Sequence, residues 1–127
     1  MCLVHDMAEA IVGDLTPHCG VPVDEKHRRE EQAMKELVDL VPELAGRDMS
    51  GLFHEYEEQL TAEAVLVKDL DRFDMIFQAF EYEQSVAGPL ALQEFFDATE
   101  GRFRVPEVQH WVEELKTKRA QLATASE

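Results

Sequence analysis

The residues with the clearest chemical potential lie in the first segment of the sequence, MCLVHDMAEAIVGDLTP. An imidazole, His5, is followed directly by the carboxylate of Asp6, and a second carboxylate, Glu9, comes one helical turn later. On a helix these three share one narrow polar stripe, and apolar residues fill the rest of the circumference. Imidazole nitrogen and carboxylate oxygen together suit a divalent metal. The spacing alone leaves two interpretations open, a metal site or an incidental His-Asp pair on a half-exposed stripe.

A distant aspartate, Asp71, belongs to a long helical pattern in which both faces are apolar. We expect this helix to be central and the face that carries Asp71 to be packed. A buried carboxylate without a partner costs several kcal/mol, so Asp71 must meet a cation. Lys68 at i−3 is the simpler candidate and a metal ion is the alternative.

The string GDLTP adds a further candidate residue, Asp14, just after Gly13. Its local context favours a turn residue. It is also a candidate metal ligand, because its loop leaves the end of the helix that presents Glu9. The run DEKHRREEQ mixes both signs of charge and is typical of a solvated helix face, and the other histidines are expected to be solvated as well (His18, His27, His54, His110).

Helices must position these residues, because apolar side chains recur with helical periodicity and no segment alternates with a period of two. Asp24 is expected to cap a helix, and Pro106 to open the last one. The sequence therefore predicts an all-α single domain over residues 1–127, ending in a fraying tail at 117–127. The expected helices cover residues 1–11 (with Gly13 just past the end), 24–41, two short segments after Pro42 and Ser50, 62–85 (stopped by Gly88 and Pro89), 90–98 and the segment from 106 onward.

Composition excludes several classes of function. The 127 residues carry 27 acidic and 12 basic side chains, a formal net charge of −15. Affinity for nucleic-acid polymers depends on lysine and arginine, so DNA or RNA is a poor candidate partner. No segment is long and apolar enough to predict a membrane span. Two cysteines, at positions 2 and 19, cannot form a disulfide framework, which predicts a reducing, cytoplasmic setting.

Three motifs, taken together and in order, resemble a known family. They are LVHDMAEAIVGDLTP, DEKHRREEQAMKELV and AEAVLVKDLDRFDMIFQAFEYE. They are similar to the HD-domain phosphohydrolases, in particular the 5′-deoxynucleotidase branch of the eukaryotic HD domain-containing protein 2 type and its bacterial relatives. The resemblance runs over nearly the whole chain. It implies an HD-domain helical bundle, usually dimeric, that removes the 5′-phosphate from deoxynucleoside monophosphates with a divalent metal cation (Mn, Co, Mg, Zn or Fe).

The resemblance also assigns roles to particular residues. His5 and Asp6 correspond to the HD dyad, and Asp71 to the distant aspartate that completes the metal site. Glu9 and Asp14 correspond to acidic residues that bind a second ion or assist the reaction, and the backbone carbonyl of Leu15 to a further metal contact. Glu9 acting as the general acid toward the leaving 5′-oxygen and Glu9 holding a second ion are ranked equally.

One feature departs from the family pattern. The family's metal site reads H…HD…D, with its first histidine on a helix upstream, whereas only four residues precede His5. The chain is therefore expected to correspond to the C-terminal two thirds of the family domain, truncated at its N-terminus. The alternative to an active enzyme is a catalytically inactive HD remnant that serves as a helical dimerisation or scaffold module. Hydrolysis of a different phosphate ester is a further alternative.

Overall fold

The computed structural model describes residues 1–15 and 19–125, which form two compact units, Met1–Ala64 and Val65–Glu127. Helices account for the regular structure throughout the described ranges, and no strand occurs there. The prediction of an all-α fold is therefore confirmed. No helix in these ranges is long and apolar enough to cross a membrane.

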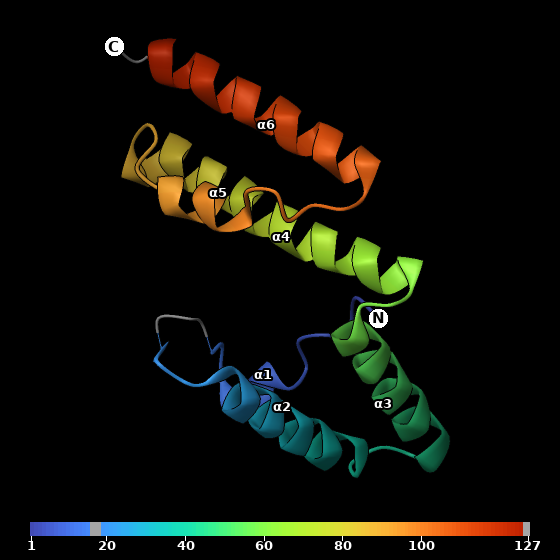
Figure 1. The fold of residues 1–127 in the computed structure, drawn as a ribbon. Helices are drawn as coiled ribbons and strands as arrows, with labels where there is room; N and C mark the ends of the chain where they lie inside the picture. The colour runs from blue at the N-terminus through green and yellow to red at the C-terminus, as the bar shows by residue number, and fades with distance from the viewer. Residues whose placement is uncertain (16–18, 126–127) are drawn as a thin grey trace. The chain divides into compact units, whose positions relative to one another are not determined.

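The described part of the first unit contains α1 (Glu9–Val12), α2 (Val23–Val38) and α3 (Glu43–Glu58). Figure 1 shows α2 and α3 in the lower half, joined by a short connection, with α1 beside α2. α2 contacts both of the others. The core between them is formed by small and medium apolar side chains, with partly buried neighbours around it (Val4, Ala8, Ala33, Met34, Phe53). This packing fixes the segment that carries His5, because Val4 and Ala8 are buried on either side of it.

The N-terminal helix is much shorter than predicted. Residues 2–8 form successive turns, and a regular α-helix covers only Glu9–Val12. Several backbone hydrogen bonds in this segment span three residues, as in Met7 N–H to Val4 and Glu9 N–H to Asp6, so the segment is coiled more tightly than an α-helix. Gly13 ends it with φ of 77°, in the left-handed region that glycine adopts without strain. The predicted glycine stop is therefore confirmed.

The other boundaries in the first unit also differ from the prediction. α2 begins at Val23 behind Pro22, so Asp24 lies in its first turn and does not cap it. α2 ends at Val38, three residues before the predicted end. The two short helices expected after Pro42 and Ser50 are one continuous helix, α3, because Ser50 and Gly51 continue the helical hydrogen-bonding pattern.

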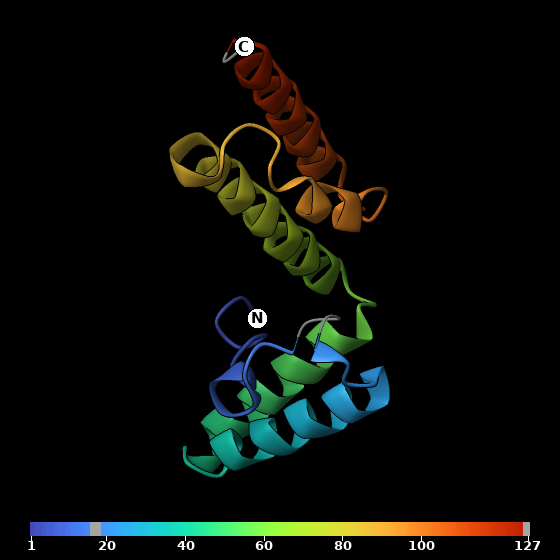
Figure 2. The same cartoon turned by 90° about the vertical axis from the view of Figure 1, so that its left-hand side faces the viewer.

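The second unit begins within α4 (Ala62–Tyr82), which continues as a π-helical turn, η2 (Glu83–Ala87), followed by α5 (Gln93–Thr99) and α6 (Pro106–Ala125). The two views in Figures 1 and 2 both place α6 alongside α4 and α5. The predicted start of the last helix at Pro106 is confirmed, and Gly88, at φ of 87°, ends η2. The core lies where the three α-helices meet (Ile76, Ala79, Phe80, Phe96, Phe103, Val108, Val112, Leu115).

The C-terminal segment is more regular than predicted. α6 continues to Ala125, past Thr117, where the sequence predicts a fraying tail. The reason is a buried ion pair: Arg119 Nε and Nη2 donate to the two carboxylate oxygens of Glu83 at 2.6 and 2.7 Å. A contact of this kind between distant helices leaves no trace in the local sequence pattern.

Candidate metal centre

His5 is held in one orientation by three contacts within the first unit. Its Nδ1 lies 2.8 Å from the carbonyl oxygen of Cys2, its ring centroid lies 4.9 Å from that of Tyr56, and its Nε2 lies 2.9 Å from Asp6 Oδ2. The side chain is 14% exposed. The predicted pairing of His5 with Asp6 is therefore present.

The contact to Cys2 determines the chemistry of the other ring nitrogen. A carbonyl oxygen can only accept a hydrogen bond, so Nδ1 must carry the hydrogen. In the neutral imidazole, Nε2 then presents its lone pair toward the carboxylate of Asp6, and two acceptors would face each other at 2.9 Å. A positive charge resolves this conflict, either a proton on Nε2 or a cation held between the two groups. A neutral imidazole oriented by a hydrogen bond to a carbonyl is also the usual arrangement of a metal-binding histidine, so the pair fits a divalent cation.

Glu9 lies close to this pair in an acidic environment. Burial raises the pKa of its carboxyl, the neighbouring charges of Asp6 and Asp14 raise it further, and Lys26 lowers it in part. Such a group holds its proton more readily than an ordinary glutamate. It is therefore suited either to donating a proton or to losing one when a cation binds.

The carbonyl of Leu15 and the side chain of Lys26 complete this part of the first unit. Lys26 Nζ donates to the Leu15 carbonyl oxygen at 3.0 Å and lies 3.5 Å from Glu30 Oε1. Asp14 is exposed on the loop between Gly13 and Leu15. The lysine thus binds the same carbonyl that the resemblance assigns to a metal.

Asp71 lies on α4 in the second unit, 3.1 Å from Lys68 Nζ. The side chains of Lys68 and Asp71 are 34% and 36% exposed, so the face is less tightly packed than the sequence predicts. The lysine pairing that was the simpler interpretation is confirmed. The convergence of Asp71 with His5 and Asp6 stays a prediction.

Sequence reasoning missed a buried carboxylate two residues before Asp71. Asp69 is completely buried, and its Oδ2 accepts hydrogen bonds from the backbone N–H groups of Arg104 and Val105 at 2.6 and 2.7 Å. Arg72 Nη1 donates to the Arg102 carbonyl at 3.1 Å in the same place. Asp69 therefore fixes the start of α6 against α4. The string KDLDRFD holds three similar aspartates, and nothing local distinguishes the structural one.

The charged run at residues 24–32 is only partly the solvated face that was predicted. Arg28 and Arg29 are exposed and both donate to Glu25, which lowers the pKa of that carboxyl to about 2. Glu30, by contrast, is buried. His27, His54 and His110 are largely exposed, as expected, and His18 lies outside the described residues.

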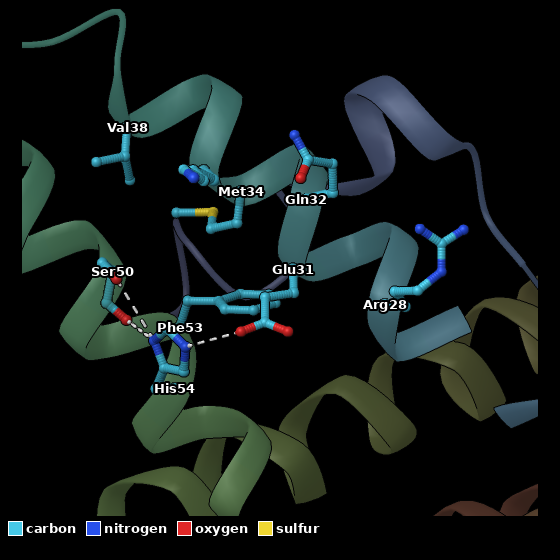
Figure 3. Close-up of a pocket in the computed structure, with 9 residues that line it drawn as sticks. Arg28, Glu31, Gln32, Met34, Val38, Ser50, Phe53 and His54 are labelled. Carbon is cyan, nitrogen blue, oxygen red and sulfur yellow. Dashed lines mark hydrogen bonds and ion pairs between the residues drawn. The ribbon is translucent and has the colours of Figure 1, made fainter. Parts of the chain in front are cut away.

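A cavity of about 360 Å³ opens between α2 and α3. Figure 3 shows its lining, with the apolar side chains of Met34, Val38 and Phe53 beside Arg28 and the His54–Glu31 pair. None of the predicted metal-site residues lines it. The cavity is therefore separate from the predicted metal ligands.

Comparison with known proteins identifies the class to which this arrangement belongs. Residues 1–109 match the sequence profile of the HD domain, so the chain belongs to the HD domain family. Among curated relatives, the 5'-deoxynucleotidase HDDC2 of Mus musculus is 50% identical over 127 residues, which cover 99% of this chain and 64% of the relative. The protein of the same name from Homo sapiens is 49% identical over 120 residues, or 94% of this chain and 59% of the relative.

More distant relatives carry the same description of activity. The 5'-deoxynucleotidase hdd1 of Schizosaccharomyces pombe is 42% identical over 125 residues, or 95% of this chain and 63% of the relative. The chain thus spans less than two thirds of the length of these curated relatives. The described residues also include histidine and carboxylate groups able to hold a metal ion, in keeping with the metal-dependent hydrolases of the family.

Proposed function

We propose that this chain, acting as one HD domain over residues 1–127, is part of a metal-dependent 5′-deoxynucleotidase. It would hydrolyse deoxynucleoside 5′-monophosphates to deoxynucleosides and phosphate. The observation that carries the proposal is the His5–Asp6 pair, in which the Cys2 carbonyl fixes Nδ1 and directs Nε2 toward a carboxylate oxygen 2.9 Å away. The names of the curated relatives supply the substrate class.

The first cation would be held by His5 Nε2, a carboxylate oxygen of Asp6 and a carboxylate oxygen of Asp71. To bind it, Asp71 would exchange its contact with Lys68 for the metal. One nitrogen and two carboxylates accept zinc, manganese, cobalt or iron, and additional carboxylates shift the preference toward magnesium. A bound divalent cation supplies Lewis-acid activation of water and neutralises charge that builds up on the phosphoryl oxygens.

Glu9 has two roles that we rank equally. With its raised pKa, its carboxyl can carry a proton and donate it to the leaving 5′-oxygen. Alternatively, Glu9 loses that proton and joins Asp14 and the Leu15 carbonyl in holding a second cation, and Lys26 must then release the carbonyl. The two roles predict different metal contents for a Glu9→Gln variant.

The acidic character of the chain explains why cations are central to this proposal. A net charge of −15 repels an anionic nucleotide, and bound dications offset that repulsion locally. We further propose that the chain forms a homodimer, with no nucleic-acid polymer or membrane as a partner. A cytoplasmic location accords with the exposed thiols of Cys2 and Cys19.

The test is phosphate release by the full chain with Mn²⁺, Co²⁺, Mg²⁺, Zn²⁺ or Fe²⁺, comparing deoxynucleoside with ribonucleoside 5′-monophosphates. We expect the deoxy substrates to be preferred. His5→Ala and Asp71→Asn should each lower kcat/KM by at least about a hundredfold, because positioning and charge neutralisation both depend on the metal. His110→Ala is the matched control, since His110 pairs with Glu114 on the exposed face of α6.

The possible results separate the proposal from its alternatives. Absence of both hydrolysis and bound metal, with a folded chain, would favour a helical scaffold. Equal rates on ribonucleotides, or activity confined to another phosphate ester, would contradict the substrate assignment. Metal binding that is unchanged in both His5→Ala and Asp71→Asn would refute the proposed ligands.

A further inference from the structure

A second cluster of side chains with atoms able to bind a metal ion joins α2 and α3. A nitrogen of His27 and carboxylate oxygens of Glu30 and Glu57 lie within 4.8 Å of one another. We propose that these three residues bind a divalent transition-metal ion, such as Zn²⁺, which links α2 to α3. None of the three belongs to the ligand set proposed above for hydrolysis.

The geometry needs little change to accept such an ion. His27 Nδ1 and Glu57 Oε2 are 3.0 Å apart. In a tetrahedral zinc site with bonds of about 2.0–2.1 Å to nitrogen and oxygen, neighbouring ligand atoms lie roughly 3.4 Å apart. The 3.0 Å separation lies close to this value, and the ligand atom of Glu30 lies within 4.8 Å of the other two, so small side-chain rotations are enough.

The elements of the fold present the three ligands together. His27 and Glu30 are three residues apart on α2 and therefore lie on the same face of the helix. Glu57 reaches them from the last turn of α3, which packs against α2. Glu30 is buried, so its side chain has already lost most of its conformational freedom and provides a pre-positioned ligand.

The charges around the cluster also favour a dication. Two carboxylates meet one imidazole, and Lys26, 3.5 Å from Glu30 Oε1, is the nearby ammonium. A carboxylate has about four acceptor positions, so this contact leaves room for a metal on Glu30. A charged His27 would satisfy Glu57 as an ordinary ion pair, and metal binding requires the neutral imidazole instead. Zinc binding therefore distinguishes the metal site from a simple ion pair between His27 and Glu57.

The experiment measures zinc binding to the full chain by titration calorimetry and by metal content after dialysis. We expect the wild type to bind one zinc ion more than either His27→Gln or Glu57→Gln, or to bind it about 10–100-fold more tightly. Zinc should also raise the unfolding temperature of the wild type more than that of these variants. Both substituted side chains are partly exposed, so circular dichroism should show that the variants remain folded.

His54→Gln is the matched control. His54 also pairs with a glutamate across the same two helices, with Nε2 4.0 Å from Glu31 Oε1, but this pair belongs to no three-residue group of ligands among residues 1–15 and 19–125. Figure 3 shows this pair at the edge of the cavity. We expect His54→Gln to bind zinc like the wild type, and His5→Ala to retain the site as well. Equal zinc content and affinity in the wild type, His27→Gln and Glu57→Gln would refute the site.

Discussion

Arg119 and Glu83 form an ion pair that joins α6 to the start of η2, and removing the arginine should destabilise the second unit strongly. Both side chains are almost fully buried. Arg119 donates to both oxygens of Glu83 and to Gln93 Oε1 at 2.7 Å, and its guanidinium carbon lies 4.0 Å from the ring centroid of Phe96. Arg119→Ala removes all of these contacts and leaves a carboxylate in an apolar environment.

The size of the effect follows from that burial. Breaking a buried pair by removing one partner costs about 3–5 kcal/mol, because the remaining charge has lost its solvation. For a domain of this size, that corresponds to a fall in the unfolding temperature of roughly 10–20 °C. Lys116→Ala, one turn earlier on α6, should cost at most about 1 kcal/mol, since the Lys116–Glu100 pair is exposed to solvent.

The assay is urea unfolding followed by circular dichroism, with Arg119→Ala, Lys116→Ala and the double variant Arg119→Leu/Glu83→Leu. The double variant should lie closer to the wild type than Arg119→Ala does, because no charge is left buried. A cost for Arg119→Ala as small as that for Lys116→Ala would refute the reasoning, since it would show that the pair gains little from its burial.

The pair should also give the stability a particular dependence on pH. Burial raises the pKa of Glu83, but the hydrogen bonds from Arg119 and from the Leu92 N–H outweigh it and hold the pKa below its ordinary value of 4.5. A carboxyl whose pKa is lowered by folding stabilises the native state above that ordinary value, and the contribution is lost as the pH falls through the folded-state pKa. The stability advantage of the wild type over Glu83→Gln should therefore be constant near neutrality and shrink in acid.

Three further substitutions test other parts of the structure. Gly46→Ala should destabilise the first unit by about 1–3 kcal/mol in urea unfolding, because its new Cβ would lie 2.9 Å from Val38 Cγ1 and 3.0 Å from the Val38 carbonyl oxygen; an unchanged midpoint would contradict this. Asp69→Ala should lower the free energy of unfolding by about 2–4 kcal/mol and speed hydrogen exchange of the backbone N–H groups of Arg104 and Val105, which donate to Asp69. Unchanged protection of those two amides would contradict the anchoring role of Asp69. Leu3 and Ile11 are 91% and 49% exposed, so replacing both by glutamine should weaken self-association in analytical ultracentrifugation, and a wild type that is a stable monomer would remove the basis for this expectation.

Some features of the structure could be predicted because they depend on local rules. Helical periodicity predicted an all-α fold, and Pro106 and Gly13 predicted the start of α6 and the end of α1. These predictions were reliable because proline and glycine restrict or permit particular backbone angles whatever surrounds them. The proximity of Lys68 and Asp71 was predicted for the same kind of reason, since residues three apart on a helix share a face.

Other boundaries could not be predicted because tertiary packing overrides weak local signals. The first helix was expected over residues 1–11, yet residues 2–8 form tight turns that bury Val4 and Ala8 against α2 and α3. The apolar residues of this segment are spaced alike in a helix and in these turns, so their pattern could not distinguish the two conformations. Separate short helices were expected after Pro42 and Ser50, but α3 continues through Ser50.

The sequence by itself determined that this chain is helical, acidic and related to the HD domain family, and it identified His5, Asp6, Glu9, Asp14 and Asp71 as candidate site residues. Residue type and spacing along one helix are sufficient for those conclusions. Only the tertiary structure decided that Cys2 orients the His5 ring, that Asp69 anchors the start of α6 and that Glu30 lies with Glu57 between two helices. These contacts depend on hydrogen bonds and burial between segments distant in sequence or coiled into irregular turns, and no periodic pattern records them.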